Sequence, residues 1–158
     1  MSDSALASET IRVSADEAEV VLAELVSVEA AATVPARKEA FAALREAVEA
    51  GAIDERNVPT LEPVLELALQ TGRIRAIHGP GGEQAALRLY RRLPCGVELK
   101  RTAREVTEAL AALQGRELES LSLDAVGPAA FSISLNAGGM ALTIRLDRQG
   151  ARLASVAA

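Results

Sequence analysis

The chain has 158 residues, a length that suits about one domain with a sizeable core. Its hydrophobic fraction is 49% but its aromatic fraction is only 2%, so the core must come from aliphatic side chains, and few rings are left to stack on bases or flat cofactors. Charges interrupt every apolar stretch before the roughly 18 residues that a membrane helix needs, which argues against a bilayer-spanning segment. We also expect no secretory signal and a cytoplasmic location.

The net charge of −5 is distributed unevenly along the chain. Residues 1–72 hold 5 basic and 14 acidic groups, whereas residues 73–104 hold 8 basic and 2 acidic groups. The remaining residues, 105–158, hold 4 basic and 6 acidic groups. The basic segment 73–104 and the acidic first half therefore either attract each other within the fold or face separate partners.

The first helix is predicted from its capping signal. Residues 1–13 are small and polar, and we expect them to form a mobile tail. Ser14 and Glu17 form an S-x-x-E capping box, which predicts a helix from Ser14 to about Ala32. Glu17 and Glu24 share a helix face of the kind that solvated surfaces show. The apolar stripe of this helix is Ala18, Val21, Leu22, Leu25 and Val28.

The following segments share one pattern of helix-boundary residues. Each begins near a proline, which the first helical turn tolerates, or ends at a glycine, which accepts a left-handed conformation. This pattern predicts further helices over Pro35 to Gly51, Pro59 to Gly72, about Gly82 to Leu93, and from Pro94 to Gly115. The spacings are unequal, so we predict one helical bundle and not a repeat array.

After Gly115 the hydrophobic period changes from 3.6 to 2. Leucine, isoleucine and phenylalanine alternate with polar residues in three short segments, and a fourth segment follows them. The turns between the segments are short enough to force antiparallel neighbours. The last segment, Ala151 to Val156, alternates poorly and is predicted as an edge strand.

The predicted fold class is therefore α+β. About five helices form an N-terminal bundle, and a four-stranded antiparallel meander follows, packed on the last helix. We predict that residues 14–158 form a single domain, with a helical part at 14–115 and a sheet part at 116–158.

Two residues were considered for catalysis. His78 precedes a glycine-rich turn that leads into a helix, but general acid or base chemistry needs a second group, which the sequence does not identify. Cys95 is the only cysteine and sits at a helix start near Arg92 and Lys100, so it is a possible reactive thiol, although no C-x-x-C partner accompanies it. We identify no catalytic residue, no metal site and no cofactor motif.

The basic segment is the main candidate for binding. One triplet at i, i+3 and i+4 and another at i, i+1 and i+4 place compact positive patches on two predicted helices. The alternative is that these side chains pair with the acidic N-terminal helices. The low aromatic content and the pI near 5.0 argue against nucleic acid as a partner. The candidate binding residues are Arg73, Arg75, Arg88, Arg91, Arg92, Lys100, Arg101 and Arg104.

Three hypotheses for function remain open. The leading one is a non-catalytic accessory or protein-protein interaction module that self-associates or binds a protein partner, because charge polarity and an edge strand are ordinary means of association. The second is a protein that binds a small anionic ligand through residues 73–104. The third is a small enzyme with a cavity between helix and sheet, in which Cys95 or His78 would act.

Overall fold

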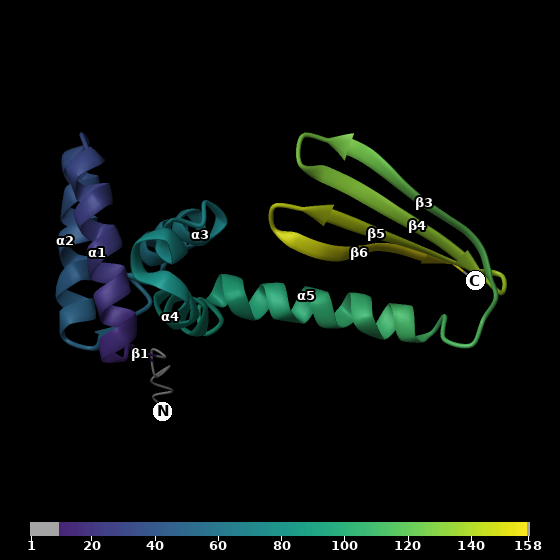
Figure 1. Ribbon diagram of the computed structural model, residues 1–158, viewed down its shortest axis with the longest axis horizontal. Coiled ribbons are helices and arrows are strands. Elements are labelled where there is room, and N and C mark those ends of the chain that lie inside the picture. Colours follow the sequence, from purple (N-terminus) through teal and green to yellow (C-terminus); the bar gives the residue numbers. More distant parts are fainter. Residues whose placement is uncertain (1–9, 158) are drawn as a thin grey trace, which may run out of the picture. The chain divides into compact units, whose positions relative to one another are not determined.

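A computed structural model describes residues 10–157, which divide into two compact units, one ending at Cys95 and one beginning at Gly96. The N-terminal unit carries a two-stranded ribbon, four helices and the first residues of a fifth, and the C-terminal unit carries the rest of that helix and a four-stranded sheet (Figure 1). The α+β class is confirmed. The sequence predicts one domain whose helical and sheet parts meet at residue 115. In the structure the compact units divide at residue 95, because the fifth helix shares its core with the sheet.

Helix α1, Ala15–Ala31, begins as predicted. The Glu17 amide donates to Ser14 Oγ, and the Ser14 amide donates at 2.9 Å to Glu17 Oε2, which completes the capping box. The prediction that Glu17 and Glu24 lie on a solvated face is wrong, because their exposed fractions are 4% and 3%. Both carboxylates are buried against arginines from elsewhere in the unit.

The next helices begin and end where proline and glycine predicted, with one exception. Helix α2 covers Pro35–Glu49 and helix α3 covers Val58–Gln70, as predicted within two residues. Helix α4 covers Arg73–Tyr90, nine residues earlier than the predicted start near Gly82. It is interrupted at Gly79, where φ is 68° and ψ is −171°. The glycine-rich turn is therefore a kink between two helical stretches.

A short antiparallel ribbon closes one end of the N-terminal unit. Strand β1, Ile11–Arg12, pairs with β2, Ala52–Ile53, and the Val13 amide donates to the Gly51 carbonyl at 2.9 Å. Of the tail predicted at residues 1–13, positions 1–9 lie outside the described residues, and the rest joins this ribbon. The core of the unit is aliphatic, as the composition predicts, and its fully buried members include Leu25, Leu44, Ile53, Leu61, Leu65, Ile74, Leu89 and Leu93.

The C-terminal unit contains the predicted meander. Its strands are β3, Leu118–Gly127, β4, Ala130–Ala137, β5, Met140–Asp147, and β6, Gly150–Ala157. They pair antiparallel in the order β3-β4-β5-β6, so β6 is an edge strand as predicted, and β3 is the other edge. The register aligns the apolar residues of all four strands on one face, for example Leu121 with Leu135 and Leu135 with Leu142.

Helix α5, Pro94–Ala111, packs on part of this apolar face. Val106 forms a buried cluster with Leu142 and Ile144 of β5. Leu99 lies against Gly150 at the start of β6, where an added Cβ would approach its Cδ1 to 2.3 Å. The cluster also takes in Ile133 and Leu135 of β4, so the helix covers β5 and the adjoining parts of β4 and β6. Within residues 10–157, the helices do not combine the length and apolarity that crossing a membrane requires.

Replacing Gly79 tests the kink in α4. A φ of 68° with a ψ of −171° lies in a region that is almost restricted to glycine, so G79A should destabilise the N-terminal unit by about 1–3 kcal/mol in urea unfolding. The matched control is G81A, because Gly81 has open space around its Cα and no positive φ, and alanine is the better helix former. Equal destabilisation by both variants would contradict the assignment.

Candidate functional site

The basic segment predicted for binding is shared between the two units. Five of its arginines lie in or just after α4 of the N-terminal unit, and three basic residues lie on α5 in the C-terminal unit. The segment is therefore two clusters. The first comprises Arg73, Arg75, Arg88, Arg91 and Arg92, and the second comprises Lys100, Arg101 and Arg104.

The α5 cluster is largely neutralised within its own helix. Arg101 pairs with Glu98 at 2.5 Å and also with Glu105, and Arg104 pairs with Glu108 at 2.8 Å. All of these side chains are exposed, so the pairs contribute little to stability. They do lower the local positive charge that an anionic partner would meet.

Two arginines of the α4 cluster instead pair with the acidic first helix. Arg73 lies 3.1 Å from the buried carboxylate of Glu24 and also donates to Ser27 Oγ at 2.5 Å. Arg92 lies 2.6 Å from the buried carboxylate of Glu17. The internal pairing that the sequence left as an alternative therefore holds for these two residues.

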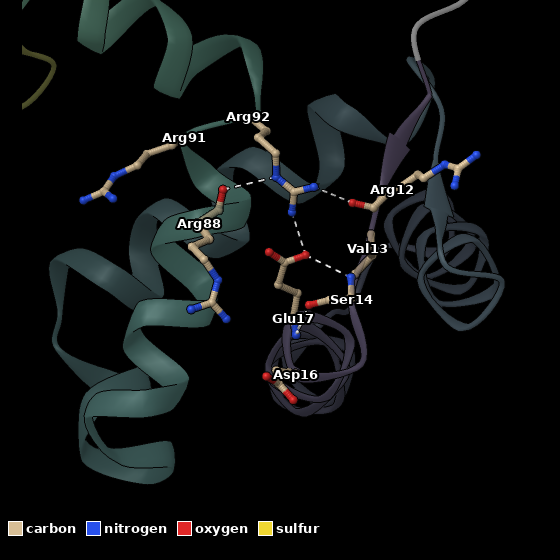
Figure 2. A pocket seen from close by; sticks show the side chains of 8 residues that line it. All are labelled: Arg12, Val13, Ser14, Asp16, Glu17, Arg88, Arg91 and Arg92. Atoms are coloured by element: carbon tan, nitrogen blue, oxygen red, sulfur yellow. Dashed lines mark hydrogen bonds and ion pairs between the residues drawn. The ribbon is translucent and has the colours of Figure 1, made fainter.

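Arg92 joins three segments through one guanidinium (Figure 2). Its Nη2 donates to Glu17, its Nη1 donates to the Arg12 carbonyl at 2.7 Å, and its Nε donates to the Arg88 carbonyl at 3.3 Å. These contacts connect the start of α1, strand β1 and the end of α4. Because Glu17 also caps α1 through Ser14, one ion pair links helix capping to tertiary packing.

The environment of Glu17 holds its pKa below the usual value of 4.5. Burial by itself would raise the pKa of this carboxyl. The hydrogen bonds from the Ser14 backbone amide and the Arg92 guanidinium, together with the positive charge of Arg92, outweigh that effect and lower it. Glu17 therefore stays ionised and serves as a structural counterion.

A groove with a cavity volume of about 710 Å³ lies beside this network, and Arg12, Arg88 and Arg91 line it. All three side chains are exposed and have no ion pair within residues 10–157. In Figure 2, however, the Arg12 and Arg91 side chains extend away from the centre on opposite sides. The guanidiniums do not converge on one point, so the groove lacks a formed anion cradle.

The candidate thiol has different neighbours from those predicted. Cys95 is half-buried, and its backbone amide donates to Glu62 Oε1 at 2.8 Å. The pKa of the nearby Tyr90 is raised, mainly by burial and then by its hydrogen bond with Cys95. Arg92, one of the two positive neighbours invoked from the sequence, is bound to Glu17. These contacts suit a packed cysteine at a helix start.

His78 lies immediately before the α4 kink. Its Nε2 is buried without a hydrogen-bond partner in the described part of the chain, and the cleft that His78 lines also contains Asp16 and Glu19. Residues 10–157 also contain no group of three or more histidine, cysteine, aspartate and glutamate side chains that could hold a metal ion.

The C-terminal sheet exposes an apolar surface that sequence analysis did not identify. Leu118, Leu121 and Leu123 on β3 are 54%, 60% and 64% exposed, and Phe131 on β4 is 42% exposed. The register places these four residues, the open leucine strip, on the same face as the buried Leu142 and Ile144. Alternation correctly assigned them to the apolar face but did not show that α5 covers only part of it.

A groove runs beside the open leucine strip, within the same unit. It has a cavity volume of about 480 Å³ and lies between the last turns of α5 and strands β3 and β4. Its apolar lining includes Leu110, Leu113, Leu118, Leu135 and Ala137. The strip and this groove together form a continuous apolar region, of the kind that marks interaction sites on protein surfaces.

Comparison with known proteins gave no match to any family model, to any curated protein or to any solved structure.

Removing Arg92 tests its structural role against a binding role. In R92A the buried Glu17 carboxylate loses its counterion, so we expect a loss of about 1–3 kcal/mol in the free energy of unfolding. The matched control is R91A, because Arg91 is exposed and unpaired within the described residues, and a change within about 0.5 kcal/mol is expected. Similar losses in both variants would show that Arg92 has no special structural role.

The lowered pKa of Glu17 predicts a pH dependence. A carboxyl whose folded pKa lies below its unfolded value stabilises the fold above the unfolded pKa, and this contribution disappears as pH falls through the folded pKa. Wild type should therefore exceed E17Q in stability at pH 7, and the difference should shrink as pH falls below 4.5. Urea unfolding of both proteins from pH 7 to pH 3 measures this, and a constant difference would contradict it.

Proposed function

We propose that this chain is a non-catalytic protein-interaction module that binds its partner through the β3 side of the C-terminal sheet. The observation that carries the proposal is the open leucine strip, in which leucines 60% and 64% exposed lie on the apolar face of the sheet. Burying a leucine side chain contributes about 1.5–3 kcal/mol, so two leucines left mostly in water are a substantial driving force for association.

The free backbone of β3 supports the same proposal. Within residues 10–157, strand β3 pairs only with β4, so its other edge presents amide and carbonyl groups that no described strand pairs. An extended partner segment that adds to such an edge gains backbone hydrogen bonds, while alternate side chains pack on the apolar face. The unpaired backbone edge and the three leucines of the open leucine strip belong to the same strand, so one partner segment can use both.

The two edges of the sheet differ in their availability. The sequence pointed to residues 151–156 as the associating edge, which corresponds to β6. Ala151 and Leu153 of this strand pack on the α5 cluster, so part of its apolar face is already covered, whereas the leucines of β3 remain exposed. Irregular pairing does not distinguish the two edges, because it occurs once beside β6 and twice beside β3. The proposed partner surface is therefore β3.

Binding of a small anion remains the second candidate. It rests on Arg88 and Arg91, which are exposed and have no ion pair within residues 10–157. The side chains around this groove do not converge (Figure 2), whereas the residues of the open leucine strip share one face of the sheet. The protein-interaction proposal therefore comes first.

Affinity purification from the source cells tests the proposed function. Tagged wild-type chain should recover a stoichiometric protein, either another protein or an untagged copy of itself. The double variant L121S/L123S should lose it, because the apolar strip becomes polar. The matched control is V26S on α1, because Val26 is 56% exposed in the other unit and should leave recovery unchanged. Recovery of a lone monomer by wild type, or equal recovery by L121S/L123S, would overturn the proposal.

A further inference from the structure

We propose that the partner is a second copy of this chain, and that two β3 strands pair antiparallel about a two-fold axis at Ser122. This inference rests on the proposed function and names its partner. It follows from three properties of β3, namely the length of its regular segment, the self-complementarity of its sequence and the placement of its charges.

The regular part of β3 is short and well defined. The pairing of β3 with β4 is irregular between Leu118 and Ser120 and again between Ala125 and Gly127. Between these bulges, residues 120–125 follow the pleat without interruption. Bulges disrupt pairing, so an added strand has to use this central segment.

The central segment is nearly palindromic in chemical type. It reads Ser-Leu-Ser-Leu-Asp from Ser120 to Asp124. A two-fold axis perpendicular to the sheet keeps each face on the same side, so opposed residues must come from the same face of β3. With the axis at Ser122, Leu121 of each copy lies opposite Leu123 of the other, and Ser122 lies opposite its own counterpart.

Charge selects this axis over its two neighbours. With the axis at Leu123, the two Asp124 carboxylates become diagonal neighbours, which like charges disfavour, and Leu121 faces only an alanine. With the axis at Leu121, Leu123 faces the bulged Glu119. With the axis at Ser122, Asp124 lies opposite Ser120, and the carboxylates of the two copies stay farther apart.

This pairing also extends the apolar surface. The leucines of both copies lie on the face where Phe131 of β4 is also exposed, so two strips become one. The polar residues Ser120, Ser122 and Asp124 remain on the opposite face, in water. Because the same patch serves both copies, the interface is isologous and closes as a dimer.

Cysteine cross-linking tests the register. Directly opposed residues of antiparallel strands have Cα atoms about 4.5–5.5 Å apart, within the range that a disulfide spans. The single native cysteine is first replaced, giving a C95S background. In that background, S122C should form a disulfide-linked dimer under mild oxidation.

Two matched variants serve as controls. In C95S/S120C, the two thiols lie four residues apart across the axis, roughly 13 Å along the strands, and should not cross-link. In C95S/S134C, the thiol lies on the interior strand β4, opposite Ser122 of the same chain, and should not cross-link either. Cross-linking of S120C or S134C as fast as S122C, or none by S122C, would overturn the proposed register.

Light scattering and sedimentation separate this inference from the proposed function. Wild type and V26S should show twice the chain mass of 16.5 kDa, and the dissociation constant of L121S/L123S should rise at least about tenfold with strand content by circular dichroism unchanged. A wild type that stays monomeric but recovers a different protein, in a manner dependent on Leu121 and Leu123, would overturn the second copy as partner and leave the interaction module standing. A monomer that recovers no protein would overturn both.

Discussion

One helix cannot cover one face of a four-stranded sheet, and this constraint shapes the C-terminal unit. A helix with its side chains is about 10 Å wide, whereas adjacent strands are about 4.8 Å apart, so a single helix covers roughly two strands. Helix α5 packs over β5, where Val106 meets Leu142 and Ile144, and over the adjoining side chains of β4 and β6. Leu121 and Leu123 of β3 lie outside the cluster under this helix and remain exposed. The candidate interaction surface is exposed because α5 alone does not extend over the whole apolar face of the sheet.

The N-terminal unit meets a different constraint, because it is rich in acidic residues and buries two of them. A buried carboxylate is costly unless it is paired and hydrogen-bonded. Arginines after the first helix supply those partners, Arg73 for Glu24 and Arg92 for Glu17. The pairing of the acidic first helix with arginines of the basic segment thus contributes to the stability of the fold. It leaves only some of the basic residues free to meet an external ligand.

Much of the architecture could be predicted from the sequence because the signals are local. The S-x-x-E motif, the proline and glycine boundary residues and the change of period after Gly115 each report on a few neighbouring residues. The first half of α4 was missed because Gly79 and Pro80 look like the end of a helix, whereas the chain absorbs them in a kink. The division at residue 95 falls inside a continuous helix, where the hydrophobic period does not change.

The candidate site was harder to predict because it depends on long-range packing. Alternation places Leu121 and Leu123 on the apolar face, but only the position of α5 shows which strands it covers. Similarly, i, i+3 and i+4 spacing groups arginines on a helix but does not show that Arg92 turns toward Glu17. Exposure of an apolar side chain and neutralisation of a charge are both tertiary properties.

The unequal protection of the two sheet edges has a consequence for assembly size. A sheet with two equally open edges adds molecules at both ends and grows into a fibril. Here the contacts of Ala151 and Leu153 with the α5 cluster cover part of the apolar face beside β6, whereas β3 is left exposed. In the proposed dimer each β3 edge is occupied by the other copy, so further growth of the sheet would have to use the β6 edges.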